Sequence, residues 1–157
     1  MGCDIHIVIE RRWEDRWVGV QMDTGIPTKG YEDEGWDYHS PAIGQRDYAF
    51  FARLAGVRGD GPEPNGLPDD MSDLAMMATE GWNGDGHSHG HLPLHQFAMR
   101  WCLGNEKFMA EMAAERLQGD DRLYSRLLHK ASAGACSYDP DYGPLPDEFR
   151  VIFWFDN

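Results

Sequence analysis

The first residues of the chain alternate between apolar and polar side chains. Residues 3–10 read Cys-Asp-Ile-His-Ile-Val-Ile-Glu, and this period of two predicts a β-strand. One face of the strand would carry the isoleucines. The opposite face would carry three ionisable side chains, which are Asp4, His6 and Glu10. The charged residues 11–16 predict a turn, and residues 17–20 predict the returning strand of a β-hairpin.

Apolar residues at helical spacing, bounded by capping residues, follow in the middle of the chain. Asp47, Ser72 and Asn105 suit N-caps, and Pro93 suits a first helical turn. The five predicted helices, each ending at a glycine, cover 47–56, 72–81, 93–104, 105–119 and 120–134. Four other stretches lack either period and predict loops, namely 21–45, 57–70, 82–90 and 138–147.

The last predicted element is a strand that is apolar on both faces. Residues 149–157 read Phe-Arg-Val-Ile-Phe-Trp-Phe-Asp-Asn, which is typical of a central strand, and its natural neighbour is the isoleucine-rich N-terminal strand. A chain of 157 residues has the size of one domain. We therefore expect a single α+β domain over 1–157, with a small sheet of adjacent N- and C-terminal strands covered by several short helices.

Charge and composition narrow the function classes. A formal net charge of −13 without a basic run argues against direct binding of nucleic acid, which needs cationic side chains. The acidity favours solubility, or imitation of a nucleic acid towards a basic protein partner. No apolar run reaches the roughly 20 residues of a membrane span, and the N-terminus lacks a secretion signal. We expect a cytoplasmic protein without a membrane contact.

Cysteine usage points to reduced thiols. The chain has three cysteines without a CxxC spacing, Cys3, Cys102 and Cys136, so neither disulfides nor a zinc finger are expected. Cys3 and Cys102 read as buried small apolar residues. A cysteine nucleophile at Cys3 with a histidine base is an alternative, but its predicted place on the apolar face of the strand argues against it.

Histidines concentrate in one segment, Asp85-Gly-His-Ser-His-Gly-His-Leu-Pro-Leu-His95, which holds four of the seven in the chain. Neutral imidazoles are frequent ligands of zinc and similar ions, and nearby carboxylates orient them. The pattern favours a metal site that includes His87, His89 and His91. The alternative is a polar, glycine-rich loop whose histidines face water.

The Asp4-x-His6 pair of the first strand would complete such a site, because residues i and i+2 of a strand face the same way. A divalent metal, such as zinc, on Asp4, His6 and His87, with Asp85 or Glu10 as general base or orienting carboxylate, would produce a metal-dependent hydrolase. A small phosphoester or a nucleotide would be its substrate. A purely structural hydrogen-bonded network of the same residues is an alternative.

Several blocks together resemble a family of short uncharacterised proteins of tailed bacteriophages and prophages. They are the opening Met-Gly-Cys-Asp-Ile-His, residues 48–58, 66–68 and 85–88, and the closing Phe-Trp-Phe-Asp-Asn. The resemblance implies a phage-encoded protein in the host cytoplasm and carries no assigned activity.

The family pattern contains Asp85, His87 and Ser88 but departs from this chain at the three following histidines, His89, His91 and His95. The resemblance therefore narrows a shared site to Asp4, His6, Asp85 and His87. A second function class stays open beside the hydrolase: a non-enzymatic acidic protein that binds and inhibits a host defence or nucleic-acid-handling protein.

Overall fold

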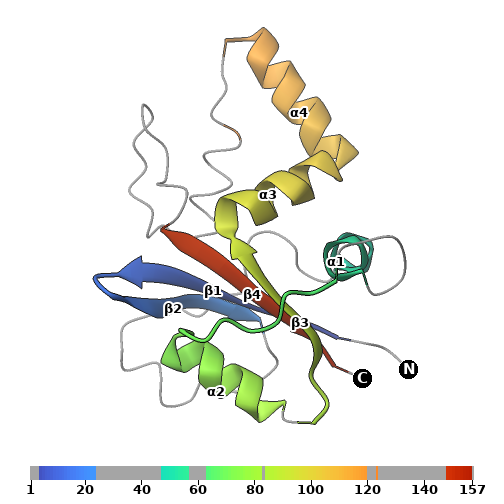
Figure 1. Ribbon diagram of the computed structural model, residues 1–157. Helices are drawn as coiled ribbons and strands as arrows, with labels where there is room; N and C mark the ends of the chain where they lie inside the picture. Colours follow the sequence, from blue (N-terminus) through green and yellow to red (C-terminus); the bar gives the residue numbers. More distant parts are fainter. Residues whose placement is uncertain are drawn as a thin grey trace.

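The fold is built on one antiparallel sheet of four strands in the order β2-β1-β4-β3. The computed structural model describes residues 4–23, 47–56, 63–82, 84–119, 123 and 148–156. The strands are β1 (Ile5–Trp13), β2 (Arg16–Asp23), β3 (His87–Pro93) and β4 (Phe149–Phe155). Figure 1 shows β4 between β1 and β3, so the predicted pairing of the N- and C-terminal strands is confirmed.

Four described helices accompany the sheet: α1 (Tyr48–Ala55), α2 (Asp73–Gly81), α3 (Leu94–Leu103) and α4 (Glu106–Leu117). Side chains of α1 and α3 pack on one face of the sheet, and side chains of α2 pack on the other. Helix α4 contacts α3 and extends beyond it, away from the sheet (Figure 1). The α+β class predicted from the sequence is therefore confirmed.

The two sheet faces carry two separate apolar cores. The isoleucines of β1 pack with phenylalanines of β4 and with α1 and α3, as their alternation predicts. On the other face Val8, Ile152 and Trp154 pack against α2. Of the predicted row of ionisable groups, His6 and Glu10 are buried on this second face, at 4% and 0% exposure, whereas Asp4 is exposed.

Capping chemistry explains where the helices begin. The side-chain oxygens of Asp47, Ser72 and Asn105 accept backbone N–H groups three residues onward, at 2.9, 3.2 and 3.0 Å. Each bond satisfies a donor that the first helical turn leaves open. Helix α1 ends at Gly56, whose φ of 65° is accessible to glycine at little cost. These caps confirm the predicted starts of three helices.

The main departure from the sequence prediction is β3. Residues 87–90 were expected in a loop, yet they form an edge strand paired with β4. The segment has few residues with high strand propensity, and pairing with the apolar β4 outweighs that local preference. Two smaller differences are that β2 continues to Asp23 and that β1 continues to Trp13.

Some predictions fall outside the described part of the chain. They are most of the loop 21–45, part of the loop 57–70, the loop 138–147, Cys3, Cys136 and the helix 120–134 apart from Leu123, which is helical. Cys102 is 3% exposed, as predicted for a buried thiol, and burial raises its pKa to about 11. Among the described helices, none combines the length and the apolar character that crossing a membrane requires.

Candidate functional site

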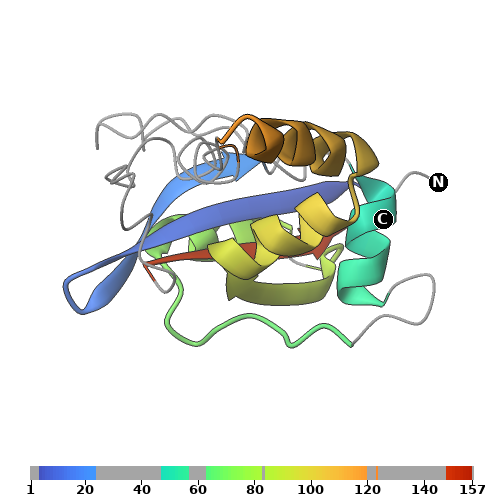
Figure 2. The ribbon, with the colours of Figure 1, turned by 90° about the horizontal axis from the view of Figure 1, so that it is seen from above.

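The start of β1 and the end of β4 meet at one end of the sheet, next to α1 (Figures 1 and 2). There Nε2 of His6 lies 3.3 Å from Oδ2 of Asp156. The backbone N–H of Asp4 donates to Oδ1 of Asp156 at 2.8 Å, and the Tyr48 hydroxyl donates to Oδ1 of Asp4 at 3.4 Å. The sequence prediction missed Asp156, although the closing Phe-Trp-Phe-Asp-Asn motif contains it.

Aromatic rings surround His6 in this cluster. Its ring stacks on Trp82 and Trp154, with centroid distances of 4.4 and 5.4 Å. Nε2 of His6 and Nε1 of Trp154 are both buried, and neither makes a hydrogen bond with correct geometry to the residues described. The contact between His6 and Asp156 is therefore a close approach rather than a well-aligned hydrogen bond.

His87 lies on the opposite face of the sheet from His6. In the register of β4, His6 pairs with Trp154 and His87 pairs with Phe155, and successive side chains of a strand point to opposite faces. The His87 ring accordingly stacks on Phe155, at a centroid distance of 5.9 Å. The sheet therefore separates the two histidines that were expected to share a metal.

His89 turns back towards the face of His6. A register shift between His87 and Gly90 marks a β-bulge, which re-aims the side chains that follow it. The His89 ring stacks on Trp154 at 6.3 Å. Burial, and secondly the charge of His87, lower the pKa of His89 below its ordinary value.

The predicted metal site is not assembled in this arrangement. Among the described residues, no group of three or more His, Cys, Asp or Glu side chains could hold a metal ion. Asp85 is exposed in the turn before β3, where its N–H donates to the Trp82 carbonyl at 3.0 Å. A divalent metal on Asp4, His6 and His87 stays a prediction that this geometry does not support.

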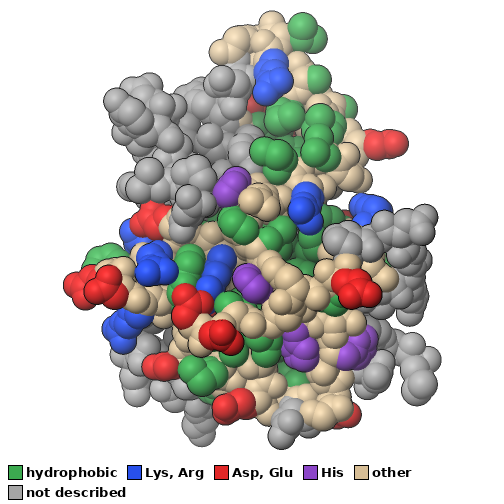
Figure 3. Space-filling model, in the orientation of Figure 1, with side chains coloured by type: hydrophobic (Ala, Val, Ile, Leu, Met, Phe, Trp, Pro, Cys, Tyr) green, Lys and Arg blue, Asp and Glu red, His purple; other side chains and the backbone are tan. Residues whose placement is uncertain are grey.

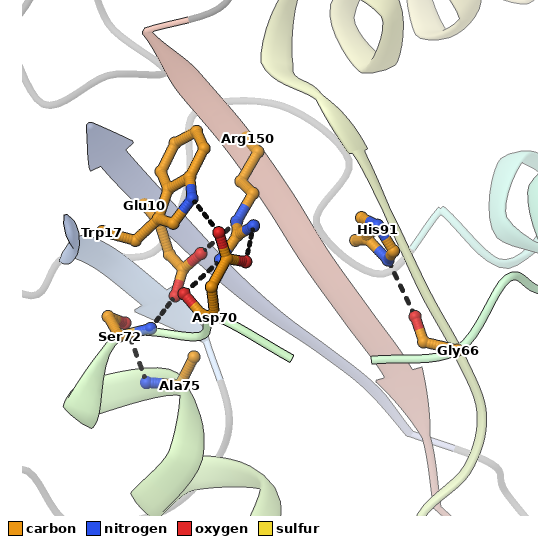
Figure 4. Close-up of polar contacts among 8 residues, drawn as sticks. All are labelled: Glu10, Trp17, Gly66, Asp70, Ser72, Ala75, His91 and Arg150. Atoms are coloured by element: carbon orange, nitrogen blue, oxygen red, sulfur yellow. Dashed lines mark hydrogen bonds and ion pairs between the residues drawn. The ribbon is translucent and has the colours of Figure 1, made fainter. Parts of the chain in front are cut away.

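Glu10 belongs to a buried ion pair with Arg150 of β4 (Figure 4). Arg150 Nε donates to Oε2 of Glu10 at 2.5 Å, and the Ser72 backbone N–H donates to Oε1 at 2.6 Å. Both carboxylate oxygens thus bind protein donors in a fully buried position. Because removal of Arg150 would leave a buried carboxylate without its cation, the geometry favours a structural role over the predicted catalytic one.

Asp70 completes this cluster at the surface. Its carboxylate accepts Nη1 of Arg150 at 2.7 Å and Nε1 of Trp17 at 3.1 Å (Figure 4). The Arg150 guanidinium also lies 4.1 Å from the centre of the Trp17 ring, a favourable cation–π distance. The hydrogen bond from Arg150 holds the pKa of Asp70 below its ordinary value.

His91 of β3 is held by a hydrogen bond from its ring to the backbone of the segment before α2. Its Nδ1 lies 2.9 Å from the Gly66 carbonyl oxygen (Figure 4). Because a carbonyl only accepts, Nδ1 carries the proton, and in the neutral ring Nε2 is left with a lone pair. The Asn65 amide fixes the same residue, since it accepts the His91 N–H at 2.9 Å and donates to the His91 carbonyl at 3.0 Å.

A cavity of about 350 Å³ opens beside His91, and we call it the His91 cavity. Its apolar lining comes from Leu54 and Phe153 among others, and its polar lining includes Glu63, His91, Gln96 and Arg100. Figure 3 shows histidine side chains along β3 on this face, with Lys or Arg side chains near its upper end. The lining therefore combines apolar side chains, which can pack against a ligand, with polar groups, which can orient it.

Comparison with known proteins leaves the family open: no family model, curated protein or solved structure matches the chain.

Proposed function

We propose that the chain is a hydrolase of a small phosphoester and that its substrate binds in the His91 cavity. The hydrogen bond from His91 Nδ1 to the Gly66 carbonyl carries this proposal. It selects the tautomer in which Nε2 is basic, and it holds the ring at the cavity wall. A positioned imidazole of this kind can act as a general base or acid. Such a group typically raises the rate of the catalysed reaction by roughly 10²- to 10⁴-fold.

The other polar groups of the His91 cavity suit a nucleoside monophosphate. Arg100 supplies an exposed guanidinium, and guanidinium groups bind phosphates through paired hydrogen bonds. Glu63 offers a carboxylate to sugar hydroxyls, and Gln96 can both donate and accept. The apolar lining around Phe153 suits a base, and the volume of about 350 Å³ lies in the range of ligand sites.

The sequence-based hypothesis assigned the same reaction class to a divalent metal near His87. The present proposal keeps the hydrolase and the substrate class and moves the acid–base group to His91. The assay should therefore contain zinc, manganese or a chelator in parallel, so that a metal requirement is measured directly.

Phosphate release from a panel of nucleoside monophosphates tests the proposal, with binding of the same compounds measured by calorimetry. His91→Asn can keep a donor for the Gly66 carbonyl but lacks the base, so turnover should fall by about 100-fold or more with little loss of binding. Arg100→Ala should weaken binding by about 10-fold or more, since a charged hydrogen bond is lost.

His95→Asn and Arg116→Ala are the matched controls, because neither side chain lines the His91 cavity. Both should leave binding and turnover unchanged. Absence of binding by every phosphoester of the panel, or equal turnover of the His91→Asn chain, would contradict the proposal.

The rival function, an acidic protein that inhibits a host protein, stays a prediction, as does the phage origin. Among the described residues, Trp13 of the β1–β2 turn is 53% exposed, and its exposed neighbours carry both signs of charge, from Arg12 and Arg16 and from Glu14 and Asp15. Exposed tryptophans are frequent anchors of protein interfaces.

A further inference from the structure

Ser88 and His87 form a hydrogen-bonded pair at the start of β3. Oγ of Ser88 lies 2.9 Å from Nδ1 of His87, which is within the range of a nucleophile and its base. In the tautomer protonated on Nε2, the serine hydroxyl donates to Nδ1, so His87 can accept its proton. Neither His87 nor Ser88 lines the His91 cavity.

The backbone of Ser88 has an unusual conformation. Its φ is 53°, in the left-handed region. Residues other than Gly, Asn and Asp seldom adopt this backbone conformation. Ser88 also lies inside the bulge between His87 and Gly90. Strained residues and bulges cluster at functional sites, where they re-aim a side chain, and the strain persists because the surrounding structure holds it.

The base of this pair is held in place by the sheet. The His87 ring stacks on Phe155, with an interplanar angle of 18°, and Phe155 is itself 3% exposed in the core. Phe155 pairs with residues of both neighbouring strands, Ile5 and His87. A buried aromatic ring therefore limits the positions that the imidazole can take, and the imidazole in turn positions the hydroxyl.

We infer that Ser88 is an activated nucleophile that reacts with carboxylic esters, with His87 as its base. Oγ of Ser88 forms a bond to the ester carbonyl carbon while its proton moves to Nδ1 of His87. The bond to the alkoxy group breaks, and the alcohol leaves with that proton. Water then cleaves the acyl-serine ester, and His87 transfers the proton in the same way.

This reaction is separate from the proposed phosphoester hydrolysis. Ser88 is the second residue of β3, directly after His87, and the His91 cavity lies at the other end of the strand, around His91, Leu92 and Pro93. The two sites use different histidines and different probes. Labelling of Ser88 should therefore proceed unchanged in the His91→Asn chain, so the two ideas can fail independently.

A fluorophosphonate probe tests the inference, because it forms a stable adduct with activated serines and releases fluoride. Peptide mass mapping of the intact chain should find the adduct on Ser88. Ser72 provides an internal comparison, since its buried hydroxyl caps α2 and should stay unlabelled. p-Nitrophenyl acetate should be hydrolysed by the same chain, with an acetyl group on Ser88 as the intermediate.

Two substitutions separate activation from mere exposure. His87→Phe keeps an aromatic ring against Phe155 and removes the base, so labelling should slow by about 10-fold or more. His89→Phe is the matched control, because the His89 ring stacks on Trp154, on the opposite face of the sheet from the His87 ring; its labelling rate should stay within about twofold of the parent.

Ser88→Gly should abolish labelling while the circular dichroism spectrum stays that of the parent, since glycine adopts the φ of this position easily. Labelling of Ser88 no faster than in the urea-unfolded chain would overturn the inference. An unchanged rate in the His87→Phe chain would overturn it as well.

Discussion

Glu10 and His6 lie on the same face of β1, and both are buried, yet their polar atoms differ in how many hydrogen bonds they make. Glu10 receives one donor on each carboxylate oxygen, from Arg150 and from the Ser72 backbone. His6 stacks between two tryptophans and has only a poorly aligned contact with Asp156. The same alternating pattern thus placed on one face a carboxylate with two hydrogen-bond donors and an imidazole whose buried Nε2 lacks an aligned hydrogen bond.

The difference shows that burial of an ionisable group does not by itself mark a reactive site. A satisfied buried pair fixes its neighbours, because each bond would be costly to lose. Here the pair joins β1 and β4 to the start of α2 through Ser72. The histidine of the proposed hydrolase lies instead on β3, at His91, where one hydrogen bond orients the ring beside a cavity.

The largest effect should come from breaking the ion pair. Arg150→Met removes the cation and leaves the Glu10 carboxylate charged in a fully buried position. The free energy of unfolding should fall by about 3–5 kcal/mol. Urea unfolding followed by tryptophan fluorescence measures the change.

The double variant Glu10→Leu/Arg150→Met sharpens this prediction. It removes both charges, so it should recover a large part of the lost stability, as replacing a buried pair by apolar residues often does. If the single Arg150→Met chain lost less than about 1 kcal/mol, the pair would behave like a surface salt bridge. The contrast with His6 would then disappear.

A smaller effect is expected at His6. His6→Phe keeps a ring between Trp82 and Trp154 and removes a buried nitrogen that lacks an aligned hydrogen bond. The free energy of unfolding should change by less than about 1.5 kcal/mol in either direction, because no good hydrogen bond is lost. A loss as large as that of Arg150→Met would show that the contact with Asp156 is as strong as the ion pair.

The smallest effect is a pH dependence from His89, which stacks on the same Trp154 as His6. Burial lowers the pKa of folded His89 below 6.5, so the unfolded chain takes up its proton first as the pH falls. Stability should therefore decrease as the pH falls through 6.5 and level off below the folded pKa. Unfolding curves of the parent and His89→Phe at pH 7.5 and pH 5 should show a shallower decrease in the variant; equal slopes would contradict the expectation.

Particular residues show how far sequence reasoning reached. The alternation of β1 and the apolar β4 predicted their pairing, and Asp47, Ser72 and Asn105 predicted three helix starts, because these signals are local. Residues 87–90 of β3 were predicted as a loop because they carry little strand propensity. Only its pairing with β4 reveals the strand.

The candidate site needed long-range information in the same way. The spacing of His87, His89 and His91 suggested one metal cluster, but the bulge and the sheet place these rings in different surroundings. Arg150, a lone charge within an apolar strand, was a usable signal for a buried partner, and Asp156 in the closing motif was another. Neither could be paired with Glu10 or His6 before the register of β1 and β4 was known.

The sequence by itself determined the elements whose signals are short, which are the hairpin, the capped helices and the apolar terminal strand. It also determined the acidity and the histidine content from which any chemistry must be drawn. The tertiary structure alone decided which histidine faces a cavity, which carboxylate is neutralised and which serine meets a base. Those outcomes depend on strand register and on contacts between residues far apart in the chain, and no local pattern encodes them.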